Sequence, residues 1–109
     1  MGRMQREKGA RGERELSKEF IRLFGCDARR GQQYEGSSNS PDVVTSIEGI
    51  QIECKRTEAL SLYKAMEQAI KDSGDDVPLV CHRRSNKPWL AIVRLNDLGC
   101  LVNALKDHV

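Results

Sequence analysis

Two segments rich in β-branched residues, joined by a glycine-containing turn, constrain the fold of this chain more than any other feature. Residues 43–47 and 50–55 lie on either side of Glu48-Gly49, and this arrangement predicts a β-hairpin with a tight turn. Side chains alternate between the two faces of a strand, so Glu53 and Lys55 project from the same face. The hairpin therefore presents a carboxylate and an ammonium group side by side.

The predicted hairpin also brings Asp42, at the start of its first strand, close to Glu53. Antiparallel pairing places Asp42 opposite Lys55, which makes Asp42 and Glu53 diagonal neighbours about 7–8 Å apart at the backbone. Two carboxylates at that distance suit a hard divalent cation. A slip of one residue would turn Asp42 to the other face, and a solvated cross-strand Glu–Lys pair is the alternative interpretation. Spacing alone does not choose between them.

Composition indicates one small globular domain over residues 1–109. Hydrophobic residues make up 39% of the chain and charged residues 31%, which is typical of a folded protein and not of a disordered one. No apolar run approaches the roughly 20 residues needed to cross a bilayer. The amino-terminal end is too charged for a signal peptide, so we expect a cytoplasmic protein without a membrane partner. Four cysteines without a C-x-x-C pair indicate free thiols and no zinc site.

Charge is unevenly distributed along the chain. Residues 1–30 hold nine Lys and Arg against five Asp and Glu, whereas the net charge of the whole chain is only +2. A basic amino-terminal end beside an acidic metal patch suits a polyanion that is both bound and cut. An ordinary solvated helix face would look the same, so charge does not decide the function.

The remaining elements follow from periodicity and from turn residues. Residues 1–7 are predicted as a flexible basic arm, and residues 8–24 as a helix that ends at Gly25. The elements predicted after it are a strand, the hairpin, a second helix, two strands and a last helix capped by Asn96; they cover residues 26–34, 43–55, 60–73, 77–82, 89–94 and 96–107. This order predicts an α/β fold with an αβββαββα core, in which helices flank a mixed central sheet.

Two polar residues on the predicted helices raise separate questions. Glu13 precedes Leu16 by three residues, so it lies on the buried side of the first helix, where a carboxylate needs a partner. The alternative is that Glu13 sits near the helix start, where the dipole favours acids. Gln68 lies off the apolar stripe of the second helix and reads as a surface residue by pattern alone.

Several motifs together resemble one known family. They are Lys8-Gly9-Ala10 with Glu13-Arg14-Glu15-Leu16, Pro41-Asp42-Val43-Val44, Ile52-Glu53-Cys54-Lys55, Leu62-Tyr63 with Glu67-Gln68-Ala69, and His82-Arg83 with Lys87-Pro88-Trp89-Leu90. In this order they resemble the PD-(D/E)xK nuclease superfamily, and within it the archaeal-type Holliday junction resolvases and small phage or prophage endonucleases. The resemblance spans nearly the whole chain and implies a restriction-endonuclease-like fold.

The resemblance implies a metal-dependent DNA endonuclease, structure-specific and acting on branched DNA. Under this hypothesis Asp42, Glu53 and the backbone carbonyl of Cys54 bind Mg²⁺ or Mn²⁺, and Glu13 joins them directly or through water. Lys55 and Gln68 complete the catalytic set. Relatives carry a serine in the loop before the aspartate; Ser37, Ser38 and Ser40 are equal candidates here.

Basic residues from two parts of the chain are the candidates for DNA binding through phosphates. They are Arg3, Arg6, Lys8, Arg11, Arg29, Arg30, Arg83, Arg84 and Lys87. Symmetric cutting of two strands implies a twofold homodimer, acting in the cytoplasm, or in a host cytoplasm for a phage protein. The alternatives are a nuclease of the same fold acting on flaps, nicks or duplex ends, and a non-catalytic nucleic-acid-binding module.

Overall fold

The predicted order of elements is confirmed. A computed structural model describes the backbone of residues 2–31 and 41–109, and the side chains of these segments from residue 9 onward. The elements are α1 (Gly2–Phe24), β1 (Ala28–Arg30), β2 (Val43–Thr45), β3 (Ile50–Arg56), α2 (Leu62–Ser73), β4 (Val77–Arg83), β5 (Leu90–Ile92), a 3-10 helix η1 (Leu95–Asp97) and α3 (Leu98–Leu105).

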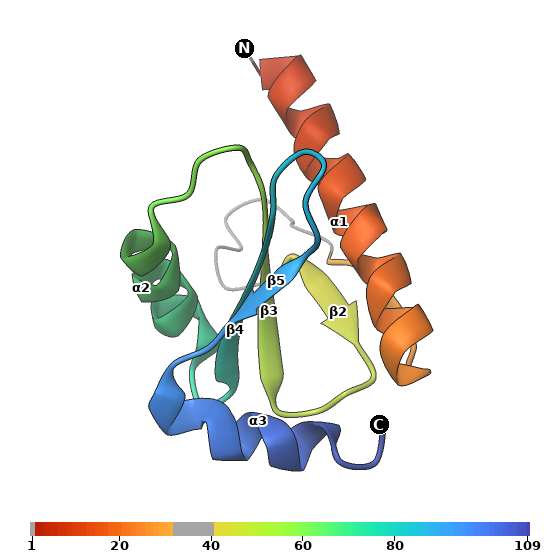
Figure 1. Ribbon diagram of the computed structural model, residues 1–109, viewed down its shortest axis with the longest axis vertical. Helices are drawn as coiled ribbons and strands as arrows, with labels where there is room; N and C mark the ends of the chain where they lie inside the picture. Colours follow the sequence, from red (N-terminus) through yellow and green to blue (C-terminus); the bar gives the residue numbers. More distant parts are fainter. Residues whose placement is uncertain (1, 32–40) are drawn as a thin grey trace.

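The five strands form one mixed sheet in the order β1-β2-β3-β4-β5. The pairs β1–β2, β2–β3 and β4–β5 are antiparallel, whereas β3 and β4 are parallel because α2 returns the chain to the same end of the sheet. Helix α1 lies along one face of the sheet and α2 along the other, with α3 near one end (Figure 1). This is the α/β restriction-endonuclease-like arrangement expected from the sequence.

The two faces of β3 serve different layers. Ile52 packs in the larger core cluster with Leu16 and Phe20 of α1. Glu53 pairs in parallel register with Val80, which packs against Ala69 and the rest of the apolar side of α2. Alternation along the strand therefore points Glu53 toward the α2 layer and its neighbours toward α1.

The predicted register of the β2–β3 hairpin is wrong by two residues. Val43 pairs with Ile52, whereas the sequence prediction pairs Val43 with Cys54. The reason is that β2 ends at Thr45, after which Ser46 turns to β1: its backbone N–H donates to the Asp27 carbonyl at 3.0 Å, and its Oγ accepts from the Asp27 N–H at 3.0 Å. A shift of two residues keeps every side chain on its face, so the predicted carboxylate face survives.

Other boundaries differ at the ends of the chain's helices. The helix α1 begins at Gly2, so residues 2–7 continue the helix where a flexible arm is predicted. Asn96 does not cap the last helix; it lies inside η1, which an ion pair between Arg94 Nε and Asp97 Oδ2 closes at 2.7 Å.

Residues 32–40, which include the candidate serines, lie outside the described residues. No helix in the described part of the chain is long and apolar enough to span a membrane.

Candidate active site

Hydrogen bonds from both its backbone and its side chain hold Asp42 in place. Its backbone N–H donates to the Ile52 carbonyl at 3.0 Å, and its carbonyl accepts from the Gly31 N–H at 2.8 Å. Its side-chain Oδ2 accepts from the Cys54 N–H at 2.8 Å. The carboxylate is therefore fixed beside the middle of β3, between the two neighbouring strands.

Gly31 is required for this arrangement. A Cβ at position 31 would lie 1.9 Å from the Pro41 carbonyl oxygen, a distance that no side chain tolerates. The close approach of Gly31 to Pro41 is what allows the Gly31–Asp42 hydrogen bond to form. Gly31 was not predicted as a site residue; a glycine inside the strand predicted over residues 26–34 was the available signal of a close backbone approach.

Glu53 is a buried carboxyl group next to Asp42. The residue is 7% exposed, and its Oε1 has no hydrogen-bond partner among the described residues. Burial raises the pKa of Glu53 from its ordinary value of 4.5 to about 8. The charge of Asp42, a hydrogen bond between the two carboxyl groups and the charge of Asp72 add to this rise, while Lys55 opposes it. The fold thus holds two acids together at an energetic cost.

These donors fit a hard divalent cation. Two carboxyl groups in contact, one with a buried oxygen that lacks a partner, have the oxygen chemistry that Mg²⁺ and Mn²⁺ prefer. The thiol beside them is unsuited to a soft metal, because burial, Asp42 and Glu13 raise the pKa of Cys54 and keep it protonated. Within residues 9–31 and 41–109, no three His, Cys, Asp or Glu side chains converge closely enough to form a metal site by themselves.

Glu13 approaches the same region from α1 but is turned toward an arginine. Its Oε1 accepts from Arg30 Nε at 2.9 Å, and its side chain is 17% exposed. Burial raises the pKa of Glu13, the charge of Asp42 raises it further, and the hydrogen bond from Arg30 opposes both. Glu13 is thus close enough to Asp42 to be affected by its charge. The partner that a carboxylate on the buried side of α1 needs is Arg30.

The position of Glu13 depends on the glycine before it. A Cβ at Gly12 would lie 2.6 Å from Arg56 Cβ and 3.7 Å from Cys54 Sγ. Helix α1 therefore crosses β3 in close contact at Gly12. The same strand carries Glu53. Only a residue without a side chain permits this approach.

On the α2 side of the site lies Asp72, a residue that was not predicted from the sequence. Gln68 is exposed, and its Nε2 donates to Asp72 Oδ2 at 3.0 Å. Buried Gln51, on the same face of β3 as Glu53, donates from Nε2 to the Asp72 carbonyl at 3.1 Å. Asp72 thus joins Gln68 to the site and contributes to the raised pKa of Glu53. Its spacing of four residues from Gln68 on one helix was the available signal.

The predicted DNA-binding residues fall into three groups. The side chains of Arg3, Arg6 and Lys8 lie outside the described ones. Exposed positions are taken by Arg11, Arg29, Arg84 and Lys87. The other two are engaged within the protein, since Arg30 binds Glu13 and Arg83 binds Glu15.

Comparison with known proteins identifies a family for most of the chain. A family model described as archaeal Holliday junction resolvase (hjc) matches residues 4–93. No curated protein matches the chain. The matched range begins in α1 and ends just after β5, so it contains every candidate catalytic residue and leaves out α3.

Proposed function

This chain belongs to the archaeal Holliday junction resolvase family, a family of nucleases, and from that premise we propose that it is a divalent-metal-dependent endonuclease that cuts branched DNA. The observation that carries the proposal is the buried carboxyl pair of Asp42 and Glu53. A fold that keeps two acids in contact, and raises the pKa of one of them to about 8, has a reason to do so if a cation binds between them.

The proposed metal ligands are Asp42, Glu53 and the backbone carbonyl of Cys54, with Glu13 contributing directly or through water. A bound Mg²⁺ or Mn²⁺ supplies Lewis acidity toward the scissile phosphate and lowers the pKa of a bound water. Holding the ion requires Glu53 to lose its proton, and Lys55 favours this loss because its charge lowers the pKa of Glu53.

The remaining side chains position the reactants. The Cys54 N–H fixes the orientation of the Asp42 carboxylate, so this ligand needs no reorganisation when substrate arrives. The Lys55 ammonium group offsets the negative charge that develops on the phosphate oxygens. Gln68 has its amide oriented by Asp72, and its proposed role is to orient water or a phosphate oxygen.

Substrate binding in this proposal relies on exposed cations that contact phosphates without reading sequence. Among the predicted contacts, Arg11, Arg29, Arg84 and Lys87 are exposed and suited to this role. Symmetric cuts in the two strands of a four-way junction require two sites, so a twofold homodimer working in the cytoplasm completes the proposal.

The test is cleavage of a labelled four-way junction and of a matched linear duplex, with Mg²⁺ or with EDTA. Wild type is compared with Glu53→Ala, and with Glu48→Ala as a control at an exposed turn position. Paired symmetric cuts in the junction, lost with EDTA or Glu53→Ala and kept by Glu48→Ala, are expected. Cleavage that survives Glu53→Ala in a folded protein would refute the assigned site. Cutting of linear, flapped or nicked DNA instead would retain the nuclease and remove the resolvase.

A further inference from the structure

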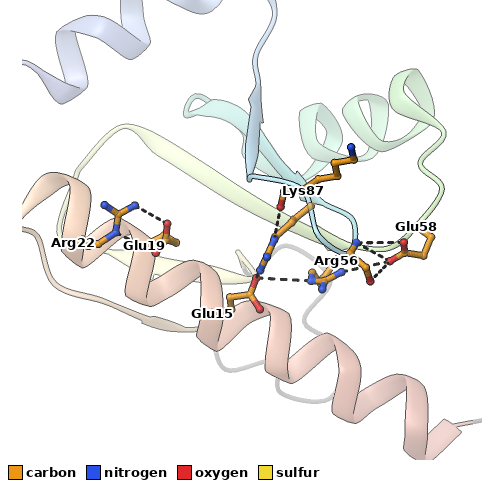
Figure 2. A network of polar contacts seen from close by, with 8 residues as sticks. Glu15, Glu19, Arg22, Arg56, Glu58 and Lys87 are labelled. Atoms are coloured by element: carbon orange, nitrogen blue, oxygen red, sulfur yellow. Dashed lines mark hydrogen bonds and ion pairs between the residues drawn. The ribbon is translucent and has the colours of Figure 1, made fainter.

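A group of polar side chains away from the carboxyl pair ties the turn between β4 and β5 to the rest of the protein. We call this group the turn network; its members are Glu15, Arg56, Glu58, Arg83 and Ser85. They come from α1, from β3, from the loop after β3, from β4 and from the turn itself. Figure 2 shows how these contacts connect α1 with the two strands.

Arg83, the last residue of β4, connects the turn to α1. Its Nη1 donates to Glu15 Oε1, and its Nε donates to the Lys87 carbonyl at 2.6 Å. Arg83 therefore bridges the far end of the turn and the helix that carries Glu13. Sequence analysis predicts Arg83 as a DNA contact, but both of these donors are occupied by the protein.

Glu58 holds the turn from the other side. Its Oε2 accepts from the Ser85 N–H at 3.0 Å and from Ser85 Oγ at 2.8 Å. The same oxygen lies 3.6 Å from Arg56 Nη1, and Arg56 Nε lies 3.8 Å from Glu15 Oε1. The Arg56 side chain is only 18% exposed. Arg56 thus links both carboxylates to β3, one residue after Lys55.

The turn that these contacts hold carries two exposed cations, Arg84 and Lys87. Neither forms a side-chain ion pair with any residue in the described segments. The turn closes through a hydrogen bond from the Lys87 N–H to the Arg84 carbonyl at 3.2 Å, and Asn86 takes the left-handed conformation with φ of 64°. The turn follows β4 directly, and the last two residues of β4, His82 and Arg83, pair with Lys55 and Arg56. The turn therefore lies beyond the end of the sheet at which Lys55 lies.

We propose that Glu15 and Glu58 are positioning residues that fix this turn relative to the catalytic strand, so that Arg84 and Lys87 contact a DNA arm at a set angle to the cleaved phosphate. The inference rests on the proposed function and adds to it a determinant of substrate shape. Arms of a junction differ from a linear duplex in the angle at which they leave the cut site. A rigid second contact selects that angle, whereas a loose turn would accept any DNA.

A purely electrostatic role of these carboxylates predicts the opposite result. Removing a negative charge from a DNA-binding surface strengthens binding to junction and duplex alike. A positioning role predicts that the preference for the junction falls even though the surface becomes more basic. The direction of the change therefore separates the two roles.

The experiment measures the dissociation constants and the kcat and KM of cleavage for a four-way junction and a linear duplex at one salt concentration. The variants are Glu15→Gln and Glu58→Gln. The control is Glu19→Gln, which removes the same charge from α1, where Glu19 pairs only with Arg22 among the contacts in Figure 2. Glu15→Gln and Glu58→Gln are expected to lower the junction-to-duplex preference roughly threefold to tenfold. The change should lie in KM, with kcat kept.

Ser85→Ala provides a second variant without any change of charge. It removes the Oγ hydrogen bond to Glu58, and we expect it to lower the junction preference in the same direction, with little added by combining it with Glu58→Gln. The Glu58 side chain is 56% exposed, so its variant tests the inference even if Glu15→Gln unfolds the protein.

Two results would overturn the inference while leaving the nuclease intact. One is a junction preference in Glu15→Gln and Glu58→Gln equal to that of Glu19→Gln. The other is an equal decrease in the dissociation constants for both DNAs. A wild-type protein that cuts neither DNA with Mg²⁺ or Mn²⁺ would instead refute the proposed function, and the inference with it.

Discussion

The carboxyl pair and the turn network use charge in opposite ways. At the carboxyl pair, Asp42 and Glu53 bring like groups together beside β3, and the charge of Lys55 only partly offsets the raised pKa of buried Glu53. In the turn network, Glu15 and Glu58 face the guanidinium groups of Arg83 and Arg56. The first region therefore gathers like charges that a cation would balance, whereas the second pairs opposite charges within the protein, although Arg56 Nη1 is buried without a hydrogen-bond partner among the described residues. Binding sites and positioning devices differ in this respect.

The largest expected effect concerns the free energy of unfolding of the Glu53→Gln variant in EDTA. The folded-state pKa of about 8 lies above the ordinary value of 4.5, so ionising Glu53 costs more in the folded protein than in the unfolded chain. The contribution of Glu53 to stability is therefore fully present below about pH 4.5 and is lost as the pH rises toward 8. Glu53→Gln should raise the free energy of unfolding by roughly 1–4 kcal/mol at pH 8 and change it little at pH 4.5. Urea unfolding at both pH values measures this.

The control for that prediction is Glu48→Gln, because Glu48 lies exposed in the β2–β3 turn. It should leave the pH dependence of unfolding as in wild type. Equal stability of Glu53→Gln and wild type at pH 8 would show that the carboxyl pair carries no such strain, and the contrast between the two regions would disappear.

A smaller but still large effect is expected from divalent cations. Mg²⁺ or Mn²⁺ binding to the folded form stabilises it by about 2.7 kcal/mol at a hundredfold excess over the dissociation constant. Because the cation competes with a proton on Glu53, the gain in Tm should be larger at pH 8 than at pH 6. Thermal melts of wild type and Glu53→Gln, with the metal and then with EDTA, measure it. A wild-type Tm that neither metal changes would contradict the assigned ligands.

The smallest expected effect is a decrease in the free energy of unfolding. It comes from a Glu→Gln substitution in the turn network. Glu15→Gln should lower the free energy of unfolding by about 0.5–1 kcal/mol, since its ion pair with Arg83 is only partly shielded from solvent. Glu19→Gln, on the same helix, should cost less. Chemical unfolding at low salt and at 1 M NaCl measures both, and screening should shrink the difference. A Glu15→Gln protein more stable than wild type would overturn the comparison.

The sequence predicts local features of this molecule better than its long-range pairs. Gly25 ends the first helix as predicted, with φ of 61°, because a glycine at a helix C-terminus acts through its own backbone conformation. The register of the hairpin depends on Ser46 contacting Asp27, which lies just before β1. No pattern within the hairpin contains that information, so its pairing is shifted by two residues from the prediction.

The residues of the candidate site also differ in how well the sequence predicts their contacts. Asp42, Glu53 and Lys55 are predictable because they lie in one hairpin, and a two-residue shift preserves their face. The partner of Glu13 is Arg30, seventeen positions away on a different element, and the partner of Glu15 is Arg83, sixty-eight positions away. These pairs depend on how α1 crosses the sheet at Gly12, which only the folded structure reveals.

The parallel pairing of β3 with β4 has a consequence for the order in which the protein matures during synthesis. Asp42 and Glu53 come from neighbouring strands, so they can meet as soon as the hairpin forms. The neighbour that buries Glu53 from the other side is Val80, which leaves the ribosome only after the whole of α2. A nascent chain that ends before β4 would therefore lack much of the burial that is the largest cause of the raised pKa of Glu53, and would keep only the contribution of Asp42. The acidic pair acquires its full strain only when the last strands join the sheet.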